Sequence, residues 1–395
     1  MSLPRLVHNS TDLTRLVNEG YAVSIRSGHL IVDDIPYVTD IGDLARGSLI
    51  CPLDTQGDTT IKPATHVMWF TAVPHVTAGV EIPGFVHQLG PIQLADGLVA
   101  GCASSQKAFG REPADYYEKV LTYTRVIIGY AQVFDPTATP TTFKPVSTDE
   151  TDSVFHYIDT NSSRAGITAL SDKTALARVA IIGLGGTGSY LLDLLAKCPI
   201  KEIHLYDADV FSTHNAYRFP GAASVEDLNA APLKVDFHAD RYSRLRRGII
   251  AHSTYVTSQN VAELLTMDFV FLAMDANEDK KTIVDAFTES EVAFVDTGIG
   301  VRHDANGLAG LLRVTTSLPG RRDHVGAGQL IAYELGDGDE YETNIQVAEL
   351  NSLASALAVI RFKKHYGFYS DADGELHTLY RIDSNELLND CTEAD

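Results

Sequence analysis

Residues 179–218 read VAIIGLGGTGSYLLDLLAKCPIKEIHLYDADVFSTHNAYR, and this stretch decides the fold of the second half of the chain. An apolar run over 179–182 leads directly into a glycine-rich turn, and a helical pattern and a second apolar run follow. The second run ends at Asp207. A strand, a glycine turn, a helix, a strand and an acid in this order predict a nucleotide-binding βαβ unit. The turn contains Gly183, Gly185, Gly186 and Gly188.

The glycines of the turn have separate physical roles. Gly183 permits the tight turn, Gly185 lets the backbone approach a phosphate, and Gly188 lets the helix pack closely on the strand. The N-terminus of the helix offers free N–H groups and the positive end of its dipole to an anion. Asp207 lies where an acid accepts hydrogen bonds from ribose hydroxyls. Together with Gly186, these residues are expected to bind the nucleotide.

Strands and helices alternate over the rest of this half of the chain. Such alternation predicts an α/β fold of the Rossmann type, with a mostly parallel sheet that helices cover on both faces. A second β segment over 308–315 and 329–333 and a helix over 344–362 are expected to complete it. The expected elements are strands 179–182, 202–206, 249–255, 268–273 and 292–296, and helices 187–197, 233–245 and 279–289.

The first 145 residues have a different pattern. Short β-rich runs punctuated by Gly and Pro, with helices expected near 12–19 and 114–128, predict a smaller, β-rich α+β domain. The spacing of His66, His75 and His87 matches no metal-ligand pattern, so they are interpreted as structural or surface histidines. Residues 136–150 are rich in Pro, Thr and Asp, a composition that suits a linker, and the linker is expected over 146–160. Residues 371–395 are acidic and are expected to form a mobile tail.

Length and composition limit the class of protein. A chain of 395 residues is too long for one ordinary core, which favours two domains. The net charge of −21 argues against binding to nucleic acid or to an anionic membrane. The four cysteines are far apart, so neither a disulfide framework nor a structural zinc site is expected. With no targeting or membrane-spanning pattern, a cytoplasmic location is expected.

The residues after the second strand indicate which nucleotide chemistry to expect. Asp207, Asp209, Asn215 and Arg218 form the pattern D-x-D-x5-N-x2-R, and Lys234 and the strand-ending Asp275 follow it. This ordered set resembles the E1-like superfamily, which contains the ubiquitin-activating enzymes and the sulfur-carrier adenylyltransferases of the MoeB–ThiF type. The resemblance implies an E1-like adenylation domain over residues 161–370.

The resemblance implies an enzyme that uses ATP and Mg²⁺ to adenylate the C-terminal carboxylate of a ubiquitin-like protein and releases pyrophosphate. The chemistry agrees with the residue types. Attack of a carboxylate on the α-phosphate brings anions together, which requires cations on the phosphates and a carboxylate that holds Mg²⁺. A nicotinamide dehydrogenase needs no such cations, and the chain has no evident hydride-transfer group.

The same resemblance implies roles for three acids. Asp207 resembles the ribose-binding acid, and Asp275 resembles the aspartate that binds magnesium. Asp209 resembles the second acid at the end of the strand, which can also face the metal. Asp275 is equally compatible with a helix N-cap at a strand-to-helix junction.

The cations and the amide take the remaining implied roles. Asn215 and Arg218 resemble the pair that contacts the triphosphate, and Lys234 resembles the lysine that steadies the phosphates as charge develops. Arg164 resembles an arginine that reaches the ATP site of the partner subunit, which implies a homodimer. Surface or structural roles stay open for Arg218, Lys234 and Arg164.

The chain departs from the family pattern in three places. Phe219 stands where many relatives have Gln, and the CxxC zinc pairs are missing. The stretch 315–327, TTSLPGRRDHVGA, lacks the cysteine of the thioester-forming enzymes. Cys198 reads as a packing residue, and acidic neighbours disfavour a thiolate at Cys391.

Two readings of the missing cysteine stay open. The enzyme stops at the acyl-adenylate and passes it directly to a partner, or a hydroxyl replaces the thiol. The hydroxyl candidates are Thr315, Thr316 and Ser317, with His324 as a base. A non-catalytic alternative for this stretch is a flexible loop that guides the substrate tail, with Arg321 and Arg322 contacting the carboxylate or backbone of that tail.

The combination of an N-terminal domain with this adenylation domain resembles the E1 components of bacterial ubiquitin-like conjugation operons. That resemblance implies a ubiquitin-like protein and an E2-like protein as partners, and a role in bacterial antiviral defence. Two other functions stay open: a scaffold with a degenerate nucleotide site, and adenylation of a non-protein substrate such as a tRNA modification intermediate.

Overall fold

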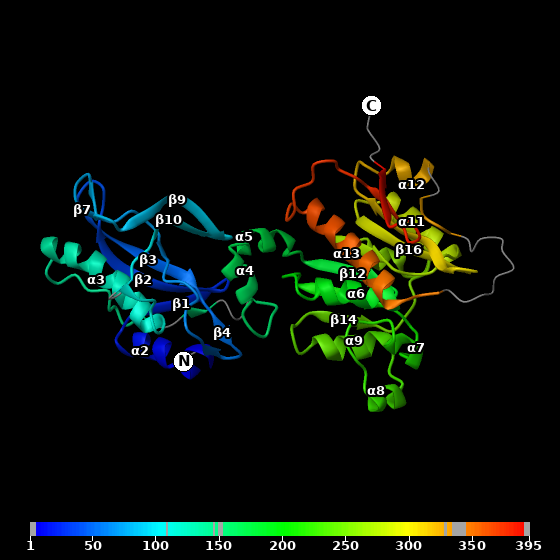
Figure 1. Cartoon of the computed structure of the whole chain (residues 1–395), viewed down its shortest axis with the longest axis horizontal. Coiled ribbons are helices and arrows are strands. Elements are labelled where there is room, and N and C mark those ends of the chain that lie inside the picture. Colours follow the sequence, from blue (N-terminus) through cyan, green and yellow to red (C-terminus); the bar gives the residue numbers. More distant parts are fainter. Residues whose placement is uncertain are drawn as a thin grey trace. The chain divides into compact units, whose positions relative to one another are not determined.

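The computed structural model describes residues 5–107, 110–144, 147–148, 153–327, 330–333 and 345–390. The chain divides into two compact units, Met1–Asp172 and Lys173–Asp395 (Figure 1). The residues expected to form a linker, 146–160, therefore fall within the first unit. Among the described residues, no helix is long and apolar enough to cross a membrane.

The first unit is built on a largely antiparallel sheet in the order β11-β1-β2-β3-β6-β10-β9, with β7 and β8 paired beside β2. Its long helix α3 (Tyr116–Phe134) packs on the sheet through one buried face, as the β-rich α+β expectation requires. The strands are β1 (Ala22–Arg26), β2 (His29–Val38), β3 (Leu44–Pro52), β4 (Thr55–Gln56), β5 (Thr59–Thr60), β6 (Met68–Phe70), β7 (His75–Thr77), β8 (Val80–Glu81), β9 (Val86–Ala95), β10 (Leu98–Ser104) and β11 (Ser147–Thr148). The other helices are α1 (Arg5–Asn9), α2 (Thr11–Asn18), α4 (Thr160–Ala165) and α5 (Thr168–Ser171).

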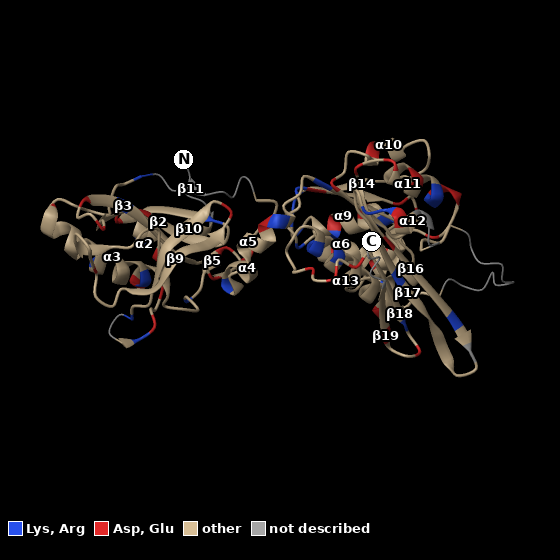
Figure 2. Cartoon of the chain, turned by 90° about the horizontal axis from the view of Figure 1, so that it is seen from above, with Lys and Arg blue, Asp and Glu red and all other residues tan. Residues whose placement is uncertain are grey.

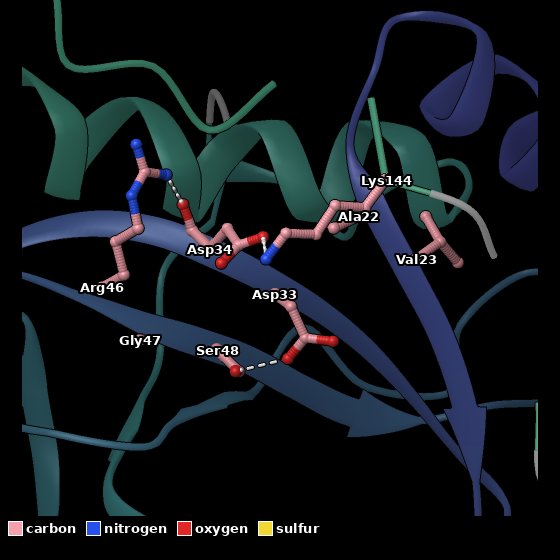
Figure 3. Close-up of a pocket in the computed structure, with 8 residues that line it drawn as sticks. All are labelled: Ala22, Val23, Asp33, Asp34, Arg46, Gly47, Ser48 and Lys144. Carbon is pink, nitrogen blue, oxygen red and sulfur yellow. Dashed lines mark hydrogen bonds and ion pairs between the residues drawn. The ribbon is translucent and has the colours of Figure 1, made fainter. Parts of the chain in front are cut away.

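A β-bulge shapes a small pocket in this unit (Figure 3). The register between β2 and β3 shifts after Val32, and Asp34 takes a positive φ of 63°. Lys144 pairs with the Asp34 carboxylate at 2.6 Å, and the Ser48 hydroxyl donates to Asp33 at 2.6 Å. The two carboxylates of this pocket of about 300 Å³ thus have partners within the unit.

The second unit contains an eight-stranded sheet in the order β14-β13-β12-β15-β16-β17-β18-β19. The pairs from β14 to β16 are parallel, and the pairs from β16 to β19 are antiparallel. This arrangement confirms the predicted Rossmann-like sheet and adds an antiparallel extension to it. The strands are β12 (Arg178–Ile182), β13 (Glu202–Tyr206), β14 (Ile249–His252), β15 (Phe269–Leu272), β16 (Ala293–Asp304), β17 (Gly307–Ser317), β18 (His377–Arg381) and β19 (Glu386–Asp390).

Helices cover both faces of this sheet, because its central strands are apolar on both sides. On β12, Val179 and Ile181 pack into one apolar cluster, whereas Ala180 and Ile182 pack into another. Helices α6 (Gly186–Leu195), α9 (Lys234–Tyr242) and α13 (Ala348–His365) lie with the first cluster, and α10 (Val261–Leu264) and α11 (Glu278–Thr288) lie with the second. The short helices are η3 (Asp172–Thr174), α7 (Thr213–Ala216), α8 (Val225–Ala230) and α12 (Asp323–Ala327).

The expectation of a mobile tail after residue 371 is wrong for β18 and β19. Residues 377–381 pair with β17, and residues 386–390 pair with β18. His377 and Thr378 are buried, and Arg361 of α13 donates to the Thr378 hydroxyl. The edge of the long β16–β17 hairpin would expose unpaired backbone groups without a partner strand. The acidic composition of the tail made the strand pattern of its residues hard to recognise in the sequence. The rest of the tail, 391–395, lies outside the described residues.

The strand expected at 329–333 is also wrong, since residues 330–333 form no strand; residue 329 is not described. Ile331 is instead buried in the apolar cluster beside α11. Figure 2 shows Lys and Arg positions scattered among Asp and Glu positions in both units.

Candidate functional site

The parallel strands of the second unit end at one edge of the sheet, and a cavity of about 450 Å³ lies there. Loops at the ends of β12, β13, β14 and β15 contribute its walls. Crevices at the carboxyl ends of parallel strands are the usual ligand sites of such sheets. The predicted site residues in its lining are Gly183, Gly185, Gly186, Asp207, Asp209, Arg218, Lys234 and Asp275. The other lining residues are Ile182, Thr187, Tyr206, His214, Tyr255, Val256, Thr257, Ala273, Met274, Asn277, Asp279 and Gln346.

The glycine turn is built as its spacing predicts. Gly183 has a φ of +89°, and a Cβ there would lie 2.5 Å from the carbonyl oxygen of Ala273. A Cβ on Gly188 would lie 1.8 Å from the carbonyl oxygen of Gly183, so this position packs the helix on the strand. Gly185 is the N-cap of α6 and supplies no side-chain cap. The first N–H groups of α6 therefore stay available to a ligand in the cavity.

Side chains of helix α13 form hydrogen bonds with the glycine turn, and the sequence analysis did not predict this contact. Thr187 donates to Asn351 Oδ1 at 3.0 Å, and the Ser355 hydroxyl donates to the Thr187 carbonyl at 2.8 Å. Asn351 and Ser355 are fully buried. A Cβ on Gly186 would lie 2.0 Å from Asn351 Nδ2, which explains why a glycine is needed there.

Asp207 is buried and organises the turn. Its Oδ2 accepts the N–H of Leu184 at 2.7 Å, and its Oδ1 accepts the N–H of Asp209 at 2.8 Å. Lys234 Nζ lies 3.5 Å from Oδ2. Asp207 thus ties the glycine turn to the loop after β13. Its predicted contact with ribose stays a prediction.

Lys234 joins Asp209 and Tyr255 in one network. Lys234 begins α9, its side chain is only 9% exposed, and its Nζ lies 2.6 Å from Asp209 Oδ2. The Tyr255 hydroxyl donates to Asp209 Oδ1. Burial opposes ionisation of Asp209, but the hydrogen bonds from Lys234 and Tyr255 outweigh it and hold the pKa below its usual value. Hydrogen bonding to Asp209 and burial raise the pKa of Tyr255 to about 12, so its hydroxyl stays a donor near neutral pH.

Asn215 and Arg218 each carry a buried donor that has no hydrogen-bond partner among the described residues. These donors are Asn215 Nδ2 and Arg218 Nε. Asn215 Oδ1 accepts the Ser212 N–H at 2.9 Å and caps α7, so Asn215 lies beside the cavity rather than in its lining. Burial lowers the pKa of Arg218, and the charge of Asp275 opposes that effect. Unpaired buried donors are costly, so a ligand that supplies acceptors would stabilise them.

Arg164 belongs to the first unit, whereas the residues that line the cavity belong to the second. It lies in α4 of the first unit, where its Nε is 3.2 Å from Asp54 Oδ1 and its side chain is 56% exposed. Its implied contact with the site of a partner subunit stays a prediction.

Phe219, the departure from the family pattern, is explained by an aromatic cluster behind Arg218. Phe219 is buried against Phe211, Phe237 and His238, with ring centroids 5.3, 5.7 and 6.0 Å away. The cluster packs the loop that carries Arg218 against α9, which carries Lys234. An apolar contact therefore takes the place of the expected amide.

His238 makes the stability of this cluster depend on pH. Its ring nitrogens lack hydrogen-bond partners among the described residues, and burial, helped by Arg241 and Lys234, lowers its pKa from 6.5 to about 3. Between these values the unfolded chain binds more protons than the folded chain, so the free energy of unfolding rises with pH. When the pH falls from 7 to 5, we expect His238 to lower the free energy of unfolding by about 2 kcal/mol.

Urea unfolding of wild type and His238→Leu at the two pH values measures this effect. The variant is expected to lose about 2 kcal/mol less than wild type on acidification. His303→Leu, at an exposed position of β16, is the matched control and should behave like wild type. Equal losses in wild type and His238→Leu would show that His238 is not the source.

The hydroxyl-nucleophile reading is wrong for this structure. Thr315, Thr316 and Ser317 belong to β17 and are buried rather than displayed in a loop. His324 lies 2.8 Å from the carbonyl oxygen of Thr316, and the Ser317 hydroxyl has no hydrogen-bond partner among the described residues. The antiparallel pairing of β17 with β16 extends to Ser317 and keeps these hydroxyls inside the sheet.

The arginines of the same stretch also have structural partners. Arg321 donates to the Gly374 carbonyl at 2.7 Å, and Arg322 donates to the Val292 carbonyl at 2.8 Å and to the Phe287 carbonyl. Both cations thus hold backbone carbonyls in this structure, and their contact with a substrate tail stays a prediction.

The cysteines in the described part of the chain offer no accessible thiol. Cys51, Cys102 and Cys198 are buried. Burial raises the pKa of all three thiols, that of Cys102 to about 12. Cys391 lies outside the described residues.

Comparison with known proteins divides the chain in two. Residues 11–160 match the model of a domain of unknown function, DUF6791, and residues 161–312 match the model of the ThiF family. No curated protein matches the chain.

Solved structures resemble the chain at low identity. E. coli MccB with MccA-N7isoASN has 17% identity and a TM-score of 0.48, over 60% of this chain and 72% of that one. E. coli MccB with ATP has 18% identity and a TM-score of 0.43, over 58% and 70%. Selenomethionine PaaA has 18% identity and a TM-score of 0.44, over 56% and 65%.

Proposed function

We propose that the ThiF-family domain of this chain, an E1-like adenylyltransferase domain formed by residues 161–312, activates the C-terminal carboxylate of a ubiquitin-like protein for transfer to an E2-like partner. The family implies ATP-dependent adenylation of a carboxylate. The choice of a ubiquitin-like protein as substrate comes from the resemblance of the whole domain arrangement to bacterial conjugation enzymes.

The observation that carries the proposal is the set of unpartnered donors at the nucleotide cavity. The first turn of α6 and the buried Nε of Arg218 offer N–H groups at one place, beside the ammonium of Lys234. Although the net charge of the chain is −21, the cations Arg218 and Lys234 and the N-terminus of α6 line the same cavity. A polyphosphate is the ligand class that such a site favours.

The proposed reaction forms one bond and breaks one. A carboxylate oxygen of the substrate attacks the α-phosphorus of ATP, the bond from that phosphorus to the α,β-bridging oxygen breaks, and pyrophosphate leaves. Negative charge grows on the transferred and leaving phosphates, where Arg218 and Lys234 stabilise it. Lys234 pairs with Asp209, and burial of its side chain holds it at the cavity wall.

The residues that line the cavity just after β15 suit a magnesium ion. Asp275 lines the cavity at this point, beside Asn277 and Asp279. Among the described residues, no group of three or more His, Cys, Asp or Glu side chains is placed to hold a metal ion. Mg²⁺ typically takes one or two carboxylates together with substrate phosphates and waters, which matches this donor set. When bound, the ion would neutralise phosphate charge.

The next acceptor is proposed to be a nucleophile of the partner protein. The three described cysteines are buried, and the hydroxyls of β17 lie inside the sheet. Direct transfer of the acyl-adenylate to an E2-like thiol requires no nucleophile from this chain. The exposed Arg164 is proposed to act in trans on the cavity of a second copy, which makes the enzyme a homodimer.

ATP–pyrophosphate exchange tests the proposal. The full chain is mixed with ATP, Mg²⁺, labelled pyrophosphate and a candidate ubiquitin-like protein. Exchange is expected with a free C-terminal carboxylate and not with the same protein amidated at its C-terminus. ATP binding without exchange would reject this substrate. A chain that fails to bind ATP with Mg²⁺ in a thermal-shift titration would instead be a scaffold.

A further inference from the structure

The order of the strands predicts where each part of a nucleotide lies. From β15 through β12 and β13 to β14, neighbouring strands end in the loops of Asp275, Gly183, Asp207 and Tyr255. Adjacent strands lie about 4.8 Å apart. With phosphates at the N-terminus of α6 and ribose at Asp207, the base extends in the direction of β14. The loop after β14 therefore stands at the base end of the cavity.

Tyr255 is fixed at both ends within this loop. Asn260 Nδ2 donates to the Tyr255 carbonyl at 2.9 Å, and Asn260 Oδ1 accepts the Thr257 N–H at 2.8 Å. The Tyr255 hydroxyl donates to Asp209. The residue is nevertheless 56% exposed and lines the cavity. A ring that is already ordered loses little conformational entropy when a planar ligand stacks on it.

The neighbours of Tyr255 suit an aromatic base. Val256 is buried in the apolar cluster beside α10, and Val256 and Thr257 line the same cavity. Of the two cations of the site, Arg218 follows α7 and Lys234 begins α9, so neither belongs to the loop that carries Tyr255. This end of the cavity thus offers a ring face and an apolar wall, which a heterocyclic base satisfies by stacking.

We propose that Tyr255 positions the base of the bound nucleotide by stacking, and that its hydroxyl bond to Asp209 holds the ring in place. This inference rests on the proposed ATP-dependent function and assigns a binding residue to the same site. The ring acts on the base, whereas Arg218 and Lys234 act on the phosphates. The two contributions are therefore separable by a ligand that has phosphates and no base.

Binding of ATP and of inorganic tripolyphosphate to the full-length protein, measured by calorimetry, tests the inference. Tyr255→Ala is expected to weaken ATP binding about tenfold, within the range for base stacking, and to leave tripolyphosphate binding within about twofold. Tyr255→Phe keeps the ring and should restore ATP affinity to within about threefold of wild type. In the exchange assay, Tyr255→Ala should raise KM for ATP about tenfold and change kcat less than about twofold.

Tyr157→Ala is the matched control, because Tyr157 is also 56% exposed and is absent from the cavity lining. Equal ATP affinity in wild type and Tyr255→Ala would overturn the inference while leaving the proposed function in place. Parallel losses for ATP and tripolyphosphate would overturn it in favour of a merely structural role. A wild-type chain that binds no ATP would remove both proposals.

Discussion

Arg218→Ala is expected to reduce pyrophosphate exchange about 100- to 1000-fold while the protein stays folded. The Arg218 guanidinium is half-buried at the cavity, and its Nε has no hydrogen-bond partner among the described residues. Burial of this cation lowers its pKa, which means that the folded chain disfavours its charged form. Its removal therefore leaves the fold intact and takes away charge stabilisation at the transferred phosphates.

Exchange rates and unfolding midpoints, measured on the same preparations, check this prediction. Arg218→Lys keeps the charge and loses the planar fork, so it should fall between wild type and Arg218→Ala. Arg244→Ala is the control, because Arg244 is 82% exposed and is absent from the cavity lining. Exchange by Arg218→Ala at the wild-type rate would contradict the assignment of Arg218 to the phosphates.

Lys280→Met is expected to lower the free energy of unfolding by about 3 kcal/mol. Lys280 and Asp296 are almost fully buried, and their Nζ and Oδ1 atoms are 2.6 Å apart. Arg313 lies 3.0 Å from the other oxygen of Asp296 and is 19% exposed. Removal of the lysine leaves a buried carboxylate with one cation, and breaking a buried pair costs more than replacing the pair by apolar groups.

Urea unfolding of Lys280→Met, Asp296→Leu, Lys281→Met and the double variant Lys280→Met/Asp296→Leu checks this expectation. Lys281 is the neighbour of Lys280 in α11, is 60% exposed and pairs with Asp285 on the surface, so its replacement should cost less than about 1 kcal/mol. The double variant should lose less stability than Lys280→Met and Asp296→Leu lose together, because neither partner is left unpaired. Strict additivity would show that the pair does not act as a unit.

The βαβ unit was predictable in detail because its signals are local. A Gly183 with φ of +89° and a Gly188 with no room for a Cβ follow from backbone geometry that a few neighbouring residues impose. The buried runs of β12 and β15 are continuous, as expected for parallel strands covered on both faces. The residues that line the cavity include Asp207, Arg218, Lys234 and Asp275, and their individual roles stay predictions.

The antiparallel extension of the sheet was not predictable from composition. Residues 377–390 are polar and acidic in sequence, yet they pair with β17 and with each other. Pairing of an edge depends on which strand lies free at that edge, and this is a property of the whole sheet. For the same reason, Thr315 and Ser317 lie in β17 and pair with β16, although the sequence suggested a loop.

By itself, the sequence determined the Rossmann-like unit, the nucleotide turn and the set of polar residues at its strand ends, because strand and helix periodicity and glycine geometry act over a few residues. Only the tertiary structure decided which side chains support that set. Asn351 reaches Thr187 across 164 positions, and Tyr255 reaches Asp209 across 46. Such contacts follow from how helices and strands pack, and no local spacing encodes them.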